Sequence, residues 1–385
     1  MGTNINGCYI AFEFPLIKEK EIENSESGIK KKIYWQFEAF QEQGYQMVYC
    51  NPYLKDNILK RKIRRRLPLF FLTKWDDGAI FDHNLNFEYI RKPWHMDGDL
   101  IQHLKKIKKK NPNIRIILEV PTYPYNKETK TISSMPLIIK DVVWRSMLKK
   151  YVDRIVTYSN DEKIFGINTI RISNAISCQN LNIAKAKDFN PKKIHIMLCA
   201  TLSYWHGYDR AITGLNEYYK NGGDINFTLH VVGQGEEFYN LQKMISAYSL
   251  DNHIIMHGNK TGKDLDELYN VCDLGFDSMG RHRAGVYYNS SLKGKEYIAK
   301  GLPVVSGVET ELDYDDSFNY YMRVPADDSP INYFAIGKFC KNIYDGKSVK
   351  SIREEIRDYA IKNYSYKKTF EKVFEFIERK EDKNK

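Results

Sequence analysis

This sequence predicts an α/β protein built from two doubly wound domains, and three observations support that prediction. The chain has 385 residues, whereas a single domain holds roughly 150. Apolar, strand-like runs alternate with helical patterns, which predicts parallel strands joined by right-handed crossovers. The alternation stops in the polar stretch at residues 173–193 and then restarts. We therefore interpret this stretch as a linker between two domains.

In the first half of the chain, short apolar runs predict strands at residues 8–14, 47–50, 87–90, 114–120 and 154–158. Two helical patterns lie between these runs. The first begins at Gly28, keeps its apolar residues on one face and ends at Gly44. The second, at residues 98–110, has a solvated basic face.

The second half repeats the same rhythm. Strands are predicted at residues 194–199, 227–232, 254–257, 274–276 and 303–306. Helices are predicted at residues 208–220, 238–248, 264–270 and 292–300, with further helix over residues 349–379. The second half is therefore expected to form a doubly wound unit of its own.

Composition narrows the class of protein. Hydrophobic residues make up 42% and charged residues 28%, which is typical of a globular chain. No run approaches the roughly 18 apolar residues of a membrane span, and the first residues lack a signal-peptide layout, so a cytoplasmic protein is expected. The six cysteines include no C-x-x-C pair, which favours reduced thiols without a zinc site.

The net charge of +10 favours anionic partners: nucleic acid, an anionic membrane or phosphorylated small molecules. The densest basic run, residues 60–66, directly precedes the apolar residues 67–72. Lys60 to Leu72 could form an interfacial membrane patch, which would place the protein peripherally on the inner face of the plasma membrane. A solvated helix end leading into a buried strand is the alternative.

Two glycine turns follow the first strands of the second half. In the first, His206 and Gly207 precede a helix whose first turn carries Arg210. Helix amides, a glycine and an arginine can together hold a diphosphate. The second turn contains Gly233 in V-G-x-G-x-E. Both segments could equally be ordinary strand-to-helix turns.

The most specific stretch is a basic loop followed by a helix start. The loop carries Arg281, His282 and Arg283, and the helix carries Ser291, Leu292, Lys293 and Glu296. A carboxylate on such a helix can accept hydrogen bonds from ribose hydroxyls, while the lysine and the helix amides face phosphate.

The motifs W-x-G-x-D-R, V-G-x-G-x-E and S-x-L-K-x-x-E-Y-x-A-x-G-x-P-V-V occur in this order in residues 205–305. In this the chain resembles the retaining GT-B glycosyltransferases of glycosyltransferase family 4. The segment E-V-P-T-Y-P-Y at 119–125 and the HRxG-like residues 281–285 are similar to a bacterial branch that builds surface polysaccharides such as capsule.

The resemblance implies two Rossmann-like domains that face each other across a cleft. Residues 1–180 would bind the acceptor, residues 190–355 would bind the donor, and a helix at 364–380 would pack back on the first domain. It further implies a UDP- or GDP-sugar as donor, a saccharide or lipid-linked acceptor, retention of configuration, and neither cofactor nor metal. The D-x-D match at residues 313–315 lies in an acidic loop and is discounted as a metal site, because a match of three residues arises easily by accident.

At the positions where the motifs match, the resemblance implies that Glu296 binds the donor ribose and that Arg210 binds the diphosphate. Gly28 would approach the donor phosphate or sugar, and His257 and Gly258 would lie against the base. The whole expected donor-binding set is Gly28, His206, Gly207, Arg210, Gly233, His257, Gly258, Arg281, His282, Arg283, Ser291, Leu292, Lys293 and Glu296.

Two positions depart from the family pattern. Tyr288 stands where the family has a first glutamate, and His206 stands where it has a lysine before the glycine. Because that lysine of the diphosphate motif is missing, Lys293 or Arg283 is expected to supply the additional positive charge.

The expected catalytic residues are Arg210 and Lys293, which would stabilise the leaving phosphate, and Glu119. Glu119 ends a predicted strand, where it could orient an acceptor hydroxyl or accept its proton, or serve as a plain turn carboxylate. Two alternative functions stay open: a basic nucleic-acid-binding protein, and a nucleotide-sugar epimerase or phosphorylase on the same fold.

Overall fold

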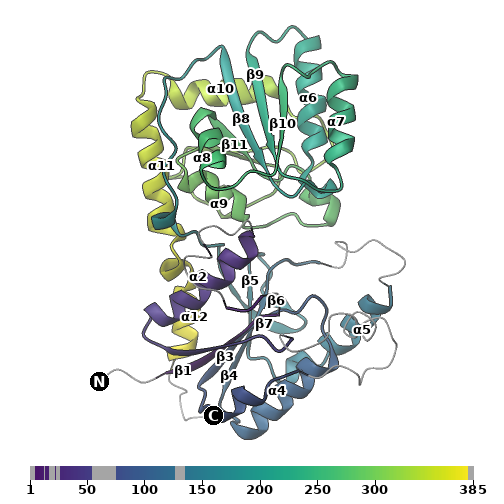
Figure 1. Cartoon of the computed structure of the whole chain (residues 1–385), viewed down its shortest axis with the longest axis vertical. Helices are drawn as coiled ribbons and strands as arrows, with labels where there is room; N and C mark the ends of the chain where they lie inside the picture. Colours follow the sequence, from purple (N-terminus) through teal and green to yellow (C-terminus); the bar gives the residue numbers. More distant parts are fainter. Residues whose placement is uncertain are drawn as a thin grey trace. The chain divides into compact units, whose positions relative to one another are not determined.

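The computed structural model describes residues 5–12, 14–16, 22, 27–53, 75–125 and 135–379. The chain forms two compact units: unit 1 is Met1–Ile172 with Thr369–Lys385, and unit 2 is Ser173–Lys368 (Figure 1). The basic and apolar run at residues 60–72 lies outside the described residues. Within the described part of the chain, none of the helices has the length and apolar character needed to cross a bilayer.

The sheet of unit 1 has the strand order β2-β1-β3-β4-β5-β7-β6. The neighbouring strands are parallel, except that β6 pairs antiparallel with β7. The strands are β1 (Asn6–Ile10), β2 (Gln46–Cys50), β3 (Phe87–Arg91), β4 (Arg115–Val120), β5 (Arg154–Thr157), β6 (Lys163–Ile164) and β7 (Ile167–Arg171).

Helices cover both faces of this sheet. The helices of unit 1 are α2 (Gly28–Glu42), α4 (Gly98–Lys110), α5 (Met135–Arg145) and α12 (Tyr366–Glu378). Aliphatic residues of α4 join one core with the strands. On the other face, aromatic rings of α2 and α12 meet: Phe40 lies edge-on to Phe370 at 5.6 Å and to Phe374 at 5.7 Å between ring centroids. These contacts dock the last helix of the chain on unit 1.

The sheet of unit 2 has the order β10-β9-β8-β11-β12-β13, and all its pairs are parallel. The strands are β8 (Lys193–Cys199), β9 (Asn226–Val232), β10 (Ile254–Gly258), β11 (Leu274–Phe276), β12 (Val304–Ser306) and β13 (Tyr321–Arg323). The helices are α6 (Tyr208–Lys220), α7 (Phe238–Ala247), α8 (Gly262–Val271), α9 (Leu292–Ala299), α10 (Tyr333–Tyr344) and α11 (Val349–Tyr364). One core cluster packs α6, α7 and α10 on the sheet, and a second packs α8, α9 and α11.

The predicted fold class, two α/β units with parallel sheets, is confirmed. The elements α5, α10, β6, β7 and β13 were not predicted. The six cysteines, all of them within the described ranges, form no disulfide.

The polar stretch at 173–193, which was expected to be a linker, lies within unit 2. Cys178 and Ala184 join a core cluster of unit 2, and arginines of α11 bind backbone carbonyls of the stretch. Arg353 donates to the Lys185 carbonyl at 2.9 Å, and Arg357 donates to the Cys178 carbonyl at 2.6 Å. Such long-range contacts leave no periodic pattern in the sequence.

We predict that Phe374→Ala destabilises unit 1, because the ring is 4% exposed and packs edge-on against Phe40 of α2 and against Tyr45. The expected loss is about 3–5 kcal/mol in the free energy of unfolding, measured by urea titration followed by circular dichroism. Phe334→Ala is the matched control, since that ring is 54% exposed. Equal losses in both variants would contradict the docking role of α12.

Candidate functional site

The strand order of unit 2 reverses direction between β8 and β11. From β8 the chain adds β9 and β10 on one side, and β11, β12 and β13 lie on the other. Ligands of doubly wound sheets bind beyond the carboxyl ends of the strands at such a switch point. The loops there are residues 200–207 after β8 and residues 277–291 after β11. These loops and the start of α9 make up the candidate site.

The start of α9 is tied to the end of β11. Ser291 is the N-cap: its hydroxyl oxygen accepts from the amides of Lys293 at 3.1 Å and Gly294 at 3.3 Å. The same hydroxyl donates to Asp277 Oδ1 at 2.6 Å. Asp277 directly follows β11 and is 4% exposed, and burial raises the pKa of its carboxyl. Leu292 is the first helical residue, so the first turn of α9 has a defined position at the switch point.

The next turn of α9 presents an ion pair. Lys293 Nζ donates to Glu296 Oε2 at 2.7 Å, and the Tyr269 hydroxyl donates to Glu296 Oε1 at 2.9 Å. Burial alone would raise the pKa of Glu296, but Lys293 and Tyr269 bring that pKa below its usual value. Desolvation opposes the charge of Lys293, yet Cys199 and Glu296 raise its pKa. The side chains are 35% exposed for Lys293 and 19% for Glu296, so solvent reaches both charged groups.

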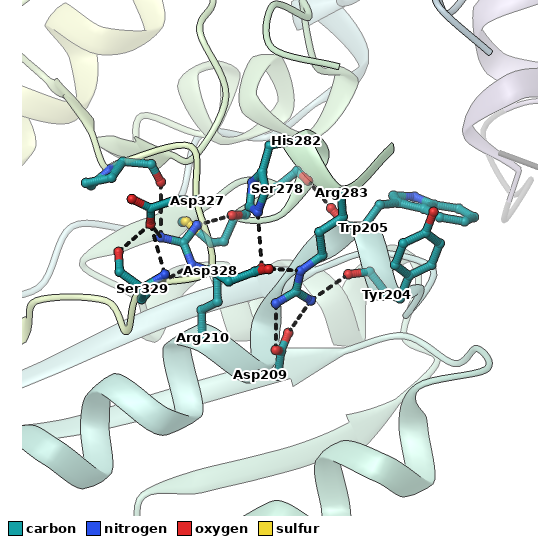
Figure 2. A network of polar contacts seen from close by, with 12 residues as sticks. Tyr204, Trp205, Asp209, Arg210, Ser278, His282, Arg283, Asp327, Asp328 and Ser329 are labelled. Atoms are coloured by element: carbon teal, nitrogen blue, oxygen red, sulfur yellow. Dashed lines mark hydrogen bonds and ion pairs between the residues drawn. The ribbon is translucent and has the colours of Figure 1, made fainter. Parts of the chain in front are cut away.

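Arg283, the other candidate for the extra cation, is bound by two carboxylates (Figure 2). Two of its nitrogens donate to Asp209 at 2.8 Å each, and Nε donates to Asp328 at 2.6 Å. These hydrogen bonds raise the pKa of Arg283. His282 also contacts Asp328, at 3.1 Å. The segment η7 (Arg281–Ala284) is thereby fastened to α6 and to the loop at 325–329, and Lys293 is left as the more accessible cation.

Arg210 does not have the expected diphosphate-binding geometry. Its side chain is 2% exposed and points into the loops around it (Figure 2). It donates to the carbonyls of Ser329 at 2.7 Å, Pro325 at 3.0 Å and Met279. Arg210 Nη2 also lies 3.6 Å from Asp327 Oδ1. Because three backbone carbonyls use this guanidinium, Arg210 shapes the site rather than presenting a charge to a ligand.

His206 ends η6 (Tyr204–His206), and its Nδ1 accepts from the Ser203 amide at 3.3 Å. Burial and the positive charge of Arg281 lower the pKa of His206 to about 3. The imidazole is therefore neutral at pH 7 and does not replace the charge of a lysine.

The glycines of the two turns serve close packing of the chain. Gly207 has φ +64°, and a Cβ there would lie 2.6 Å from the Gly280 nitrogen. Gly233 has φ +132°, and a Cβ there would lie 1.8 Å from the Ala200 carbonyl oxygen. A side chain at Gly207 would push the two loops of the site apart, and one at Gly233 would clash with the start of the loop after β8.

His257 belongs to a row of three histidines on neighbouring strands. Its Nε2 lies 3.0 Å from His230 Nδ1, and His230 Nε2 lies 2.9 Å from His195 Nδ1. Burial, together with the nearby lysines, lowers the pKa of His195 to about 4. Burial and the flanking imidazoles lower the pKa of His230 to about 4. Next to this row, the Gly258 carbonyl accepts from the Gly233 amide at 2.8 Å, which fixes the turn after β10.

Glu119 lies in unit 1 and is completely buried. Its Oε1 contacts Lys32 and Arg91 at 3.1 Å each and accepts from the Tyr158 hydroxyl at 2.8 Å. Although burial raises it, these cations lower the pKa of Glu119 to about 2. A carboxylate so enclosed and so weakly basic does not suit the catalytic role expected from the sequence.

Gly28, also in unit 1, is the first residue of α2, after the N-cap Ser27. A Cβ at this glycine would meet no atom within 4 Å. The structure thus places Lys293, Glu296, Ser291 and the 200–207 and 277–291 loops together in unit 2, with Glu119 and Gly28 in unit 1. Sequence reasoning assigned no role to Asp277, Tyr269, Asp209 and Asp328. Two usable signals existed, since Asp277 follows a predicted strand and Asp209 belongs to the W-x-G-x-D-R motif.

Comparison with solved structures identifies the two α/β units with their parallel sheets as the GT-B architecture. Sucrose-phosphate synthase of Thermosynechococcus elongatus has a TM-score of 0.64 and 12% identity, covering 97% of this chain and 98% of that one. HepE of Anabaena, solved with UDP-glucose, has a TM-score of 0.59 and 13% identity, covering 97% and 99%. A glycosyltransferase of Rickettsia africae has a TM-score of 0.58 and 13% identity, covering 98% of each chain.

At the level of sequence, residues 180–281 match the family "Glycosyl transferases group 1". This segment begins before β8 and ends at the start of η7. It therefore includes the two glycine turns and most of the sheet of unit 2. A search among curated proteins gives no significant match.

We predict that Arg210→Met destabilises unit 2, because three carbonyls lose their donor and the loops at 279 and 325–329 lose their common contact. The expected cost is about 3–5 kcal/mol, measured by chemical denaturation. Lys243→Met, on the exposed face of α7, is the control and should be near neutral. A stable Arg210→Met protein would show that the guanidinium is not structural.

The histidine row predicts that stability falls on acidification. The folded-state pKa values of His195 and His230 are about 4, against about 6.5 in the unfolded chain. The unfolded state therefore binds more protons between these values, and stability is lost as the pH falls from 6.5 towards 4.

The variant His230→Gln removes the middle group of the row, so its stability should depend less on pH between 6.5 and 5, by on the order of 1–2 kcal/mol. Urea midpoints at a series of pH values measure this. His206 contributes a slope of the same sign in both proteins. His83→Gln, at an exposed position of unit 1, serves as the control, and an unchanged slope in His230→Gln would contradict the analysis.

Proposed function

We propose that this protein is a glycosyltransferase that moves a sugar from a nucleoside diphosphate sugar to a saccharide or lipid-linked acceptor. The observation that carries the proposal is the Lys293–Glu296 pair at the start of α9, at the switch point of unit 2. The family match over residues 180–281 supports the same reaction class.

The pair is suited to a nucleotide. The carboxylate of Glu296 is kept ionised by Lys293 and oriented by Tyr269, so it can accept hydrogen bonds from two ribose hydroxyls. Lys293 can oppose the charge that develops on the leaving diphosphate, aided by the partial positive charge at the start of α9. Binding and charge stabilisation then come from one helix.

The finer parts of the proposal are a UDP- or GDP-sugar as donor, retention of configuration, and a role in surface polysaccharide synthesis. HepE of Anabaena was solved with UDP-glucose. The protein WaaB, a lipopolysaccharide outer core galactosyltransferase, has a TM-score of 0.58 and 12% identity, covering 97% of this chain and 99% of that one. The sequence resembles a family whose mechanism achieves retention by orienting the substrates and stabilising charge, without a protein nucleophile. Its test is the anomeric configuration of the product by NMR.

The proposal predicts that UDP or GDP raises the melting temperature of the wild-type protein, because a ligand at 100 times its Kd adds about 2.7 kcal/mol of stability. Glu296→Ala should clearly reduce this shift and weaken nucleotide affinity by about tenfold or more, since it removes the ribose acceptor. Thermal shift and isothermal titration calorimetry measure both effects without knowledge of the acceptor.

Glu267→Ala is the matched control, because that glutamate is exposed on α8 in the same unit. It should keep the full nucleotide shift. If Glu296→Ala binds nucleotide as tightly as Glu267→Ala does, the assignment of Glu296 fails. If folded wild-type protein binds no nucleotide at all, the proposed function fails.

A further inference from the structure

Unit 2 contains a cavity of about 480 Å³ that the candidate site does not use. One wall is the segment 186–191, which leads into β8, and the other is formed where α10 ends and α11 begins. Pockets that bind small molecules have volumes of about 300–1,000 Å³. The cavity is therefore large enough for a small ligand.

The cavity lies at the opposite edge of the sheet from the candidate site. Residues 186–191 precede β8, and Lys187 Nζ lies 3.2 Å from Oδ1 of Asp273, directly before β11. The loops of the candidate site follow the carboxyl ends of the same two strands. Because β8 has seven residues, on the order of 20 Å separates the two edges. Figure 1 shows the turn between α10 and α11 at the top of unit 2 and α9 at its bottom.

The walls of the cavity are joined by an aromatic stack. Phe189 stacks on Tyr344 with 4.6 Å between ring centroids, and the Tyr344 hydroxyl donates to the Asp273 carbonyl at 2.6 Å. The segment 186–191 and the end of α10 are thereby fixed to each other and to the chain before β11. The backbone of the cavity is thus in place before a ligand binds, so that binding orders only side chains.

Four lysines line the cavity, and two of them have no counter-ion. The four are Lys187, Lys341, Lys347 and Lys350. Lys187 pairs with Asp273, and Lys350 Nζ lies 3.9 Å from Glu354 Oε1. For Lys341 and Lys347, both exposed, no ion pair is found within the part of the chain that the structure describes. Two positive charges at this cavity are therefore available to a ligand.

We propose that this cavity binds a small phosphorylated ligand whose negative charges are compensated by Lys341 and Lys347. Lysine ammonium groups are common phosphate ligands in proteins. The start of α11 also lies at the cavity, and its first turn has no acidic residue, so its partial positive charge adds to that of the lysines.

The charge of the lining indicates the class of ligand. Asp188 and Asp345 also line the cavity, so four lysines and two aspartates leave a net charge of +2. This charge suits a ligand with two or more negative charges, as a phosphate monoester or a diphosphate has. A small molecule is favoured over nucleic acid because the lysines line one cavity and do not follow an extended surface. The inference does not rest on the proposed glycosyltransferase activity.

The test is calorimetric titration of the full-length protein with inorganic pyrophosphate at constant ionic strength. The double variant K341Q/K347Q should bind pyrophosphate at this cavity at least about tenfold more weakly, because two charged contacts are lost. Lys243→Gln, at an exposed lysine of α7 in the same unit, is the matched control and should bind like wild type. Circular dichroism confirms that each variant is folded.

The opposite change should tighten binding. Asp345→Asn removes a negative charge from the lining and should raise the affinity for pyrophosphate by about two- to fivefold. A residue with a purely structural role would not give a gain of affinity on substitution.

The ligand is located by limited acetylation of lysines followed by mass spectrometry. Pyrophosphate should protect Lys341 and Lys347 from modification and leave Lys243 unprotected. The proposed nucleotide site at the start of α9 would bind the same anion, and there Lys293→Gln should remove the binding that K341Q/K347Q keeps. The two sites are thus measured separately in the same protein.

Two outcomes would overturn the proposal. One is pyrophosphate binding by K341Q/K347Q that equals that of Lys243→Gln, and the other is protection of Lys243 to the same degree as Lys341 and Lys347, which would show general screening of charge. If Lys293→Gln changes nothing while K341Q/K347Q loses binding, the nucleotide site fails and this cavity stands. The reverse result leaves the proposed function intact and removes the cavity.

Discussion

Arg210 brings a positive charge into the interior of unit 2, where the segments around residue 279 and residues 325–329 meet α6. Its guanidinium is satisfied by backbone carbonyls of both segments. Removing a buried charge of this kind leaves several acceptors without partners at once, so the contact is worth more as a unit than as separate hydrogen bonds. The positions of η7 and of the loop that carries Asp328 follow from it.

That arrangement determines which charges the site can offer. Asp328 and Asp209 bind Arg283, and His206 is neutral because of its burial and the nearby Arg281. What remains at the start of α9 is Lys293 with Glu296, both charged and both partly exposed. The proposed anion-binding site therefore uses Lys293 and the start of α9, since Arg210 and Arg283 hold loops.

Unit 1 also buries charge, in two separate clusters. Glu119 is enclosed by Lys32 and Arg91, and His103 lies between Asp77 and Glu88. The two carboxylates raise the pKa of His103 to about 9 in spite of its burial. Asp141 on α5 is a further buried carboxylate, held by the Met96 amide and the Tyr125 hydroxyl.

The sequence alone was sufficient for the two α/β units, for most strands and for the place of the α9 motif, because periodicity and turn glycines are local properties. It could not show α10 or β13, which are held by distant neighbours, or the docking of residues 173–193 on α11. It also missed β6, because a strand of two residues is too short to leave a periodic pattern. It also could not separate the roles of Arg210, Arg283 and Lys293, because in the sequence all three are simply basic residues near predicted turns. Only the tertiary structure decided that two of them hold loops and one faces solvent, because burial and the choice of charge partner arise from residues tens of positions apart in the chain.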